Sequence, residues 1–211
     1  RSTLFPYTTL FRSLKLSHRM QALCIGPGLG HEKGTAECVR ALVKTCSCPL
    51  ILDADGLNAF KDCSDELAEH AGPLIMTPHR GEWKRLFGPL PLTPLQQLQE
   101  LRTKALKLKA VILLKGSPSM IALPDGRFFL APYGNSALAK AGSGDVLAGC
   151  IAALVALDSA QGGSLQETAL LAAWLQGRAG ELAAEELSEY SVTASEVIHF
   201  IPKAIKELLL P

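Results

Sequence analysis

The part of this sequence best suited to chemistry consists of Gly142, Ser143, Gly144 and Asp145. Glycines let a backbone turn sharply and bring its N–H groups close to a ligand. The apolar residues that follow predict a buried helix, and the N-terminus of a helix carries about half a positive charge, which suits a phosphate group. Asp145 would lie beside that phosphate, where it could accept a proton from an attacking hydroxyl. As an ordinary first-turn acid, it would need no ligand.

A second glycine-containing segment, residues 26–30, reads Gly-Pro-Gly-Leu-Gly. It lacks the full spacing of a dinucleotide-binding fingerprint, and tight-turn formation is the simpler explanation of its glycines. Asp53 and Asp55 follow the next apolar run. Their carboxylates could hold Mg²⁺ through water, or Asp53 could cap the helix that follows it.

Three more polar side chains come soon after apolar runs: His79, Glu82 and Lys115. His79 could contact a ligand or be a satisfied structural side chain. Glu82 could pair with Arg80 or cap a helix. Lys115 could meet a nucleotide phosphate or remain solvated. The residue types alone leave each of these alternatives open.

The segments just described follow short runs that are apolar throughout, which is typical of strands in a parallel sheet covered on both faces. Helical spacing between the runs then predicts an α/β fold with a mainly parallel central sheet and helices on both faces. Because the carboxyl ends of such strands line the ligand crevice, we expect the polar turns to converge at one edge. Thr193 and Glu196 fit a capping box before the last helix. We expect strands at 22–25, 49–52, 74–76 and 110–114, a hairpin of 120–123 and 127–130, and helices at 32–45, 92–109, 143–157, 165–187 and 193–209.

Length and composition indicate one globular domain. The 211 residues are 48% hydrophobic and 19% charged, with a formal net charge of +1. That charge balance argues against non-specific binding to nucleic acid, and no apolar run approaches the roughly 18 residues of a membrane span. The six cysteines form no CxxC pair and have no histidine at metal spacing near them. This pattern favours reduced thiols in a cytoplasmic protein.

The first segment, residues 1–13, is expected to lie outside the fold. It has neither helical nor strand periodicity and resembles the translation of a sequencing-adapter oligonucleotide, so we set it aside as one sets aside a tag. We therefore expect residues 14–211 to form one partial domain whose N-terminal part is missing.

Five motifs, in this order, resemble the ADP- or ATP-dependent NAD(P)H-hydrate dehydratases of the ribokinase-like superfamily. The resemblance covers nearly all of residues 21–209. GSGD before an apolar helix is shared across the superfamily, whereas GPGLG, LDADGLN and TPHRGE narrow the match to the family. The motifs are GPGLG at 26–30, LDADGLN at 52–58, TPHRGE at 77–82, LKG at 114–116 and NSALAKAGSGDVLAG at 135–149.

The resemblance implies a lyase that repairs NADH and NADPH hydrated on the nicotinamide ring. Enzymes of this family phosphorylate the hydroxyl of the S epimer and then eliminate phosphate to restore NAD(P)H, releasing AMP from ADP, or ADP from ATP. We accordingly expect ADP or ATP as co-substrate, Mg²⁺ as cofactor and a cytoplasmic homo-oligomer. In some relatives an epimerase domain precedes this one, and it could have been part of this protein.

The resemblance also implies roles for individual residues. Asp145 would be the base that deprotonates the hydroxyl, and it would bind the hydrate together with Gly28 and His79. Backbone N–H groups of the anion hole would stabilise the transferring phosphoryl group; they belong to Gly142, Ser143 and Gly144. The AMP part of the nucleotide would be contacted by Lys115, Gly116, Ser117, Pro118, Ser119 and Gly144. No protein ligand to Mg²⁺ can be named from the resemblance.

Two other functions are alternatives. The first is a ribokinase-like kinase for a vitamin precursor or sugar, which would accumulate a stable phosphorylated product; the TPHRGE motif argues against it. The second is a non-catalytic nucleotide-binding protein, whose function would be untouched by Asp145→Asn.

Overall fold

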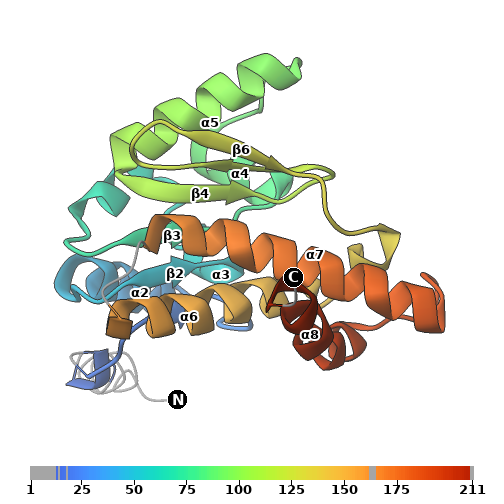
Figure 1. Cartoon of the computed structure of the whole chain (residues 1–211). Helices are drawn as coiled ribbons and strands as arrows, with labels where there is room; N and C mark the ends of the chain where they lie inside the picture. The colour runs from blue at the N-terminus through green and yellow to red at the C-terminus, as the bar shows by residue number, and fades with distance from the viewer. Residues whose placement is uncertain (1–12, 14, 18, 162–164, 210–211) are drawn as a thin grey trace.

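The computed structural model describes residues 13, 15–17, 19–161 and 165–209. All of the expected adapter-like segment except Ser13 lies outside these described residues. At the centre is a six-stranded sheet whose strands follow one another in sequence order (Figure 1). The strands are β1 (Leu23–Ile25), β2 (Leu50–Leu52), β3 (Leu74–Met76), β4 (Ala110–Leu114), β5 (Ser119–Ala122) and β6 (Phe128–Ala131).

The first four strands are parallel, and β5 and β6 form an antiparallel hairpin beside β4. Ile25 pairs with Leu52, and Leu52 pairs with Met76, so β1, β2 and β3 end at one level. β4 continues two residues beyond Ile112, the partner of Met76. The segments that follow these strands therefore begin at a common carboxyl edge, as expected from the sequence.

Helices cover both faces of the sheet. Leu50 and Leu52 point toward one helical layer and Ile51 toward the other, and all three are buried. This two-sided burial is why the strands are apolar throughout. One layer contains α2 (Lys33–Thr45), α3 (Ala54–Asn58), α4 (Arg80–Phe87) and α5 (Pro94–Leu108); the other contains α6 (Ser143–Gln161) and α7 (Leu165–Leu187), with α8 (Ala194–Leu209) packed on α7 (Figure 1).

The expected elements are confirmed, with differences of a few residues at the ends of strands and helices. The predicted helix over 92–109 begins at Pro94, because the Thr93 side chain accepts a hydrogen bond from the Gln96 amide and caps it. The expected capping box is present before α8: the Thr193 amide donates to Glu196 Oε2, and the Glu196 amide donates to Thr193 Oγ1.

Helix α6 extends to Gln161, four residues beyond its expected end. Among the described residues it is the single helix long and apolar enough to cross a membrane by length and composition. Leu147, Ala148 and Ile151 on this helix are buried against the sheet and α7. This packing accounts for the apolar residues on one side of the helix, and 33% of the apolar stretch is buried.

Candidate active site

At the carboxyl edge, the turns that follow β1 and β2 lie directly against each other. Gly26 has a φ of +142°, and a Cβ atom there would lie 1.6 Å from the carbonyl oxygen of Asp53. A Cβ atom on Gly56 would lie 2.4 Å from the carbonyl oxygen of Ile25. Neither position has room for a side chain, so the two glycines allow this close approach.

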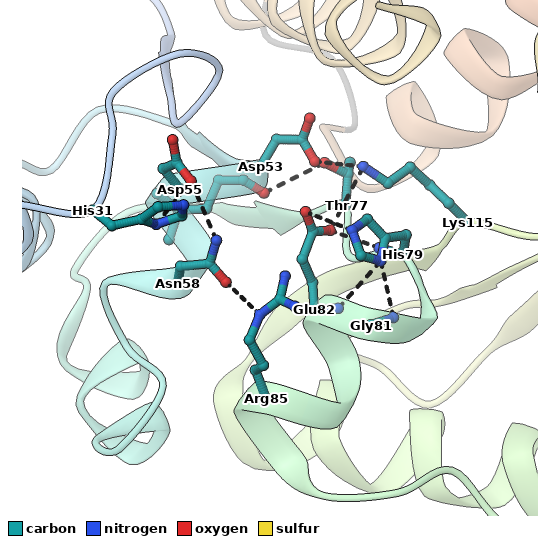
Figure 2. Close-up of polar contacts among 11 residues, drawn as sticks. His31, Asp53, Asp55, Asn58, Thr77, His79, Gly81, Glu82, Arg85 and Lys115 are labelled. Carbon is teal, nitrogen blue, oxygen red and sulfur yellow. Dashed lines mark hydrogen bonds and ion pairs between the residues drawn. The ribbon is translucent and has the colours of Figure 1, made fainter. Parts of the chain in front are cut away.

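A buried cluster of three charges occupies the middle of the edge (Figure 2). The Lys115 ammonium donates to Asp53 Oδ1 at 2.7 Å and lies 3.7 Å from Glu82 Oε2. The side chains of Asp53 and Glu82 are only 2% and 5% exposed, and that of Lys115 is 20% exposed. Asp53 makes no side-chain cap to α3, and Lys115 is paired rather than solvated. We name this group the Asp53–Lys115–Glu82 cluster.

His79 and Glu82 cap the start of α4. His79 Nδ1 accepts hydrogen bonds from the amides of Gly81 and Glu82, while Glu82 Oε2 accepts from the His79 amide. Because Nδ1 is an acceptor, Nε2 carries the ring proton of a neutral His79 and lies 3.2 Å from Glu82 Oε1. Of the two alternatives for Glu82, capping is therefore found, and Arg80 instead donates to Gln97. The His79 side chain is half exposed and could still contact a ligand.

Asp55 belongs to a separate group on the β1 side of the cluster (Figure 2). Its Oδ2 atom accepts from the Gly30 amide at 2.8 Å, and its Oδ1 atom accepts from Asn58 and lies 3.2 Å from His31 Nδ1. Asp53 and Asp55 thus face different partners, and the structure does not bring them together as a carboxylate pair. Asp55 holds the end of the 26–30 loop that contains Gly28.

The glycine turn at the start of α6 meets the charged cluster. Gly142 adopts a φ of +87°, and a Cβ atom on Gly144 would lie 3.4 Å from Lys115 Nζ and 3.7 Å from Asp53 Oδ2. The Ser143 amide, expected in the anion hole, donates to the Lys140 carbonyl at 3.2 Å. Within the described part of the chain, the Gly142 and Gly144 amides donate to no backbone acceptor outside regular structure. The first N–H groups of a helix have no partner within the helix, so an anion at this turn could accept hydrogen bonds from them.

Asp145, in the first turn of α6, is exposed and lies close to the end of β1. Burial raises the pKa of the Cys24 thiol to about 11, and the charges of Asp53 and Asp145 add to that rise. Asp145 is not among the lining residues of the cavity beside α6 or of the groove beside the Gly28 loop. Its exposure leaves the carboxylate accessible, as a general base requires.

A cavity of about 430 Å³ opens beside the same helix terminus. Its lining includes Lys115, Gly116, Ser117, Ser119 and Gly144, which are five of the six residues expected to contact the nucleotide. Pro118 follows a cis peptide bond and is not among the lining residues. The lining also includes Tyr133, Gly134, Asn135, Leu138 and Gln176. Asn135 and Leu138 belong to the motif at 135–149, but the sequence interpretation assigned no role to any of these five residues.

The expected hydrate-binding residues come from three different turns at the same edge. Gly28 is exposed in the loop after β1, His79 follows β3, and Asp145 begins α6. A larger, mainly apolar groove of about 980 Å³ borders the Gly28 loop and is lined by Cys24, Gly26 and Leu29 together with residues of α2. The arrangement leaves open space around Gly28, where no atom lies within 4 Å of a Cβ built on it.

The carboxylates of the Asp53–Lys115–Glu82 cluster provide the hard oxygen atoms that Mg²⁺ prefers. Among the residues that the structure describes, no three His, Cys, Asp or Glu side chains gather closely enough to hold a metal ion by themselves. A magnesium ion at this edge would therefore depend on nucleotide phosphates and water for most of its ligands.

The pairing of Asp53 with Lys115 was not predicted from the sequence. Both residues had been recognised as polar groups at strand ends, and their opposite charges were a usable signal. The missing information was that β2 and β4 flank β3, with the bridge between His79 and Lys115 extending the β3–β4 pairing. Only that strand order places the two side chains across one another.

A family model described as NAD(P)H-hydrate dehydratase matches residues 3–203 of this chain. The bifunctional NAD(P)H-hydrate repair enzyme Nnr of Thermofilum pendens is 38% identical over 210 residues, which cover 96% of this chain and 38% of that protein. The ADP-dependent (S)-NAD(P)H-hydrate dehydratase of Bacillus subtilis is 34% identical over 197 residues, covering 91% of this chain and 66% of that protein. The chain thus spans little more than a third of the bifunctional relative.

Solved structures agree with the sequence matches. The ADP/ATP-dependent NAD(P)H-hydrate dehydratase of Bacillus subtilis, co-crystallised with ATP/Mg²⁺, superposes with a TM-score of 0.75 at 33% identity, covering 92% of this chain and 69% of that one. A ribokinase-like superfamily protein of Enterococcus faecalis gives a TM-score of 0.76 at 24% identity, covering 97% of this chain and 69% of that one, and supports the fold alone. The expected ribokinase-like architecture is confirmed.

Proposed function

The chain belongs to the NAD(P)H-hydrate dehydratase family, and from that premise we propose that it dehydrates the S epimer of hydrated NADH or NADPH at the expense of ADP or ATP. One observation carries the proposal most directly. The N-terminus of α6 borders a cavity lined by the expected nucleotide residues and presents the exposed Asp145 carboxylate at the same edge. A phosphoryl donor and a hydroxyl acceptor can therefore meet beside one base.

In the first step, Asp145 accepts the proton of the substrate hydroxyl as the hydroxyl oxygen attacks the terminal phosphorus of the nucleotide. The bond from phosphorus to the bridging oxygen breaks, and AMP leaves from ADP, or ADP from ATP. The amides of Gly142 and Gly144, together with the positive end of α6, stabilise charge on the transferring group. Lys115 supplies a cation at the rim of the cavity.

In the second step, phosphate leaves with the electron pair of its carbon–oxygen bond, and the ring-nitrogen lone pair forms a carbon–nitrogen double bond in its place. Loss of a proton from the neighbouring carbon restores the dihydropyridine. Hydroxide is a poor leaving group and phosphate a good one, which is why the nucleotide is needed. Elimination makes the enzyme a carbon–oxygen lyase rather than a kinase, since no phosphorylated product accumulates.

The remaining expectations stay proposals. We propose that Mg²⁺ accompanies the nucleotide, where the buried carboxylate oxygens of Asp53 and Glu82 would help to hold it and the ion would supply positive charge to the phosphates. We also propose a homo-oligomer located in the cytoplasm. The word bifunctional in the names of several relatives is compatible with an attached epimerase. Residues 1–13 are proposed to be adapter-derived, with 14–211 as a partial domain.

The test compares the protein with its Asp145→Asn variant on hydrated NADH with ADP or ATP and Mg²⁺. Recovery of reduced-nicotinamide absorbance is expected for the protein, and Asp145→Asn should lower kcat by about 10²- to 10⁴-fold while nucleotide affinity is largely kept. Asp62→Asn, at an exposed position outside the site, is the matched control and should retain full activity.

No recovery with either nucleotide would reject the dehydratase. Accumulation of a stable phosphate ester from a vitamin precursor or sugar would instead identify a kinase. Unchanged function in Asp145→Asn would indicate a non-catalytic nucleotide-binding protein.

A further inference from the structure

Lys140 makes an unusual set of contacts just upstream of the α6 glycine turn. Its ammonium donates to three main-chain carbonyl oxygens, those of Glu189 at 2.9 Å, Tyr190 at 2.9 Å and Val192 at 2.6 Å. An ammonium has three N–H donors, so these carbonyls satisfy it completely. The three oxygens belong to the connection between α7 and α8 and together form what we call the carbonyl cradle.

The segment from Asn135 to Gly142 is attached to the α7–α8 layer at several other points. The Asn135 side chain caps the short 3-10 helix at Ser136–Leu138. Leu138 packs so closely on α7 that a Cβ atom on Gly180 would lie 2.7 Å from its Cδ2 atom. At the other end, a Cβ atom on Gly142 would lie 3.1 Å from the Cβ atom of Ala194.

Lys140 also reaches the phosphate-binding turn through its own backbone. Its carbonyl accepts the Ser143 amide at 3.2 Å, and the Ser143 carbonyl in turn accepts a hydrogen bond from the Gln176 side chain of α7. The side chain of Lys140 thus binds the α7–α8 connection, while its main chain binds Ser143, the first residue of α6. Displacing the Lys140 side chain would release the turn from that connection.

We propose that Lys140 is a positioning residue for phosphoryl transfer, and that the carbonyl cradle is a binding site for a compact monovalent cation that this protein fills with its own lysine. Neutral carbonyl dipoles hold the ammonium, so its charge is not cancelled by a carboxylate bond. The cation therefore holds in place the turn that carries the Gly142 and Gly144 amides. This inference rests on the proposed function.

The decisive experiment removes the side chain and supplies a free cation. Lys140→Ala should lower kcat by about 10- to 100-fold, since a small misplacement of the anion-binding amides is costly to phosphoryl transfer. At constant ionic strength, ammonium chloride should restore much of that loss, because NH₄⁺ can donate to the same three carbonyls. Tetramethylammonium chloride has no N–H donor and should restore none.

Two further variants control for indirect effects. Lys206→Ala removes an exposed lysine of α8 and should leave activity unchanged with either salt. Lys140→Gln keeps a side chain in the cradle with two donors and no charge, so it should be impaired but insensitive to ammonium. Ammonium rescue of kcat restricted to Lys140→Ala, measured where that variant is fully folded in both salts, is the signature that a lysine needed only for stability would not give.

Hydrogen exchange of the unliganded protein separates this inference from the proposed function. Lys140→Ala should exchange faster at residues 136–146 and 188–193, and ammonium should restore the protection, whether or not the protein proves to be a dehydratase. If Lys140→Ala keeps full activity and wild-type protection, or if ammonium and tetramethylammonium act alike, the inference is wrong. If Lys140→Ala does not fold, Lys140→Gln takes its place in the test. Activity and hydrogen-exchange protection of Lys140→Gln equal to those of the unmodified protein would then overturn the inference.

Discussion

Replacing Lys115 by methionine is expected to destabilise the protein severely, because the ion pair it removes is buried. The Lys115 Nζ and Asp53 Oδ1 atoms are 2.7 Å apart. At an effective dielectric constant of about 20, the attraction at that distance is roughly 6 kcal/mol, much of it offset by desolvation. Lys115→Met leaves the Asp53 carboxylate, only 2% exposed, beside the buried Glu82 carboxylate without a cation. Leaving one buried charge without its partner costs about 3–5 kcal/mol.

Urea unfolding of a double-mutant cycle measures this cost. Lys115→Met should lower the free energy of unfolding by about 3–5 kcal/mol, and adding Asp53→Asn should recover part of it, because the unpaired charge is then gone. The matched control is Lys107→Met: Lys107 and Asp65 are also 2.7 Å apart, but their side chains are 53% and 75% exposed. Solvent screens such a pair, so the control should change stability little.

The reasoning would be refuted if Lys115→Met behaved like Lys107→Met, or if the cycle gave no coupling between Lys115 and Asp53. Either result would mean that water screens the cluster as it screens the surface pair. The electrostatic account of the carboxyl edge would then fail, together with the proposed contribution of the Lys115 charge at the rim of the nucleotide cavity.

Three further predictions concern the same edge. Gly26→Ala should lower the free energy of unfolding by at least about 3 kcal/mol, because its Cβ atom would overlap the Asp53 carbonyl. Gly28→Ala should lower it by only about 1 kcal/mol, because Gly28 has a φ of +71° but open space around it. Similar losses for the two variants in thermal or urea unfolding would contradict this. His79→Ala should lose about 1 kcal/mol of helix capping and His79→Asn almost none, while both should raise KM for the hydrate if the imidazole contacts it. The pKa of Cys24 is about 11 in the folded protein, against 9.0 for a free thiol, so folding favours the neutral thiol. The stability that the neutral thiol contributes is present below pH 9 and is lost as the pH rises from about 9 to about 11. Cys24→Ala should fall less steeply than the protein over that range, and parallel curves would count against the burial of the thiol.

Much of the fold could be predicted because its determinants are local. The strand runs at 50–52 and 74–76 are apolar throughout since both faces are covered, and the hairpin follows from the turn residues Pro124-Asp125-Gly126. Capping at Thr193 was also readable, because a capping box spans only four residues. Helix ends were less certain, as the extra residues of α6 show, since packing rather than propensity decides where an apolar helix stops.

The candidate site was predicted in part. The glycine turn before Asp145 and the nucleotide residues around Lys115 lie at one edge, as chain direction required. The sequence could not tell whether Glu82 pairs with Arg80 or caps α4, because both interactions are possible within three residues and only side-chain geometry distinguishes them. It likewise could not show that Asp53 and Asp55 serve different partners.

By itself, then, the sequence determined which segments along the chain are strands and which are helices. It also determined that the first strands run parallel and that a glycine turn is followed by an acid. Tertiary structure alone decided the charge pairing and the anchoring of that turn. Asp53 and Lys115 are 62 positions apart, and Lys140 is about 50 positions from the carbonyls that hold it. No local rule relates residues so distant, because their meeting depends on which strands are neighbours and on how α7 and α8 pack over α6. The short-range pattern specifies the elements, and the burial of their apolar faces then brings the charges together.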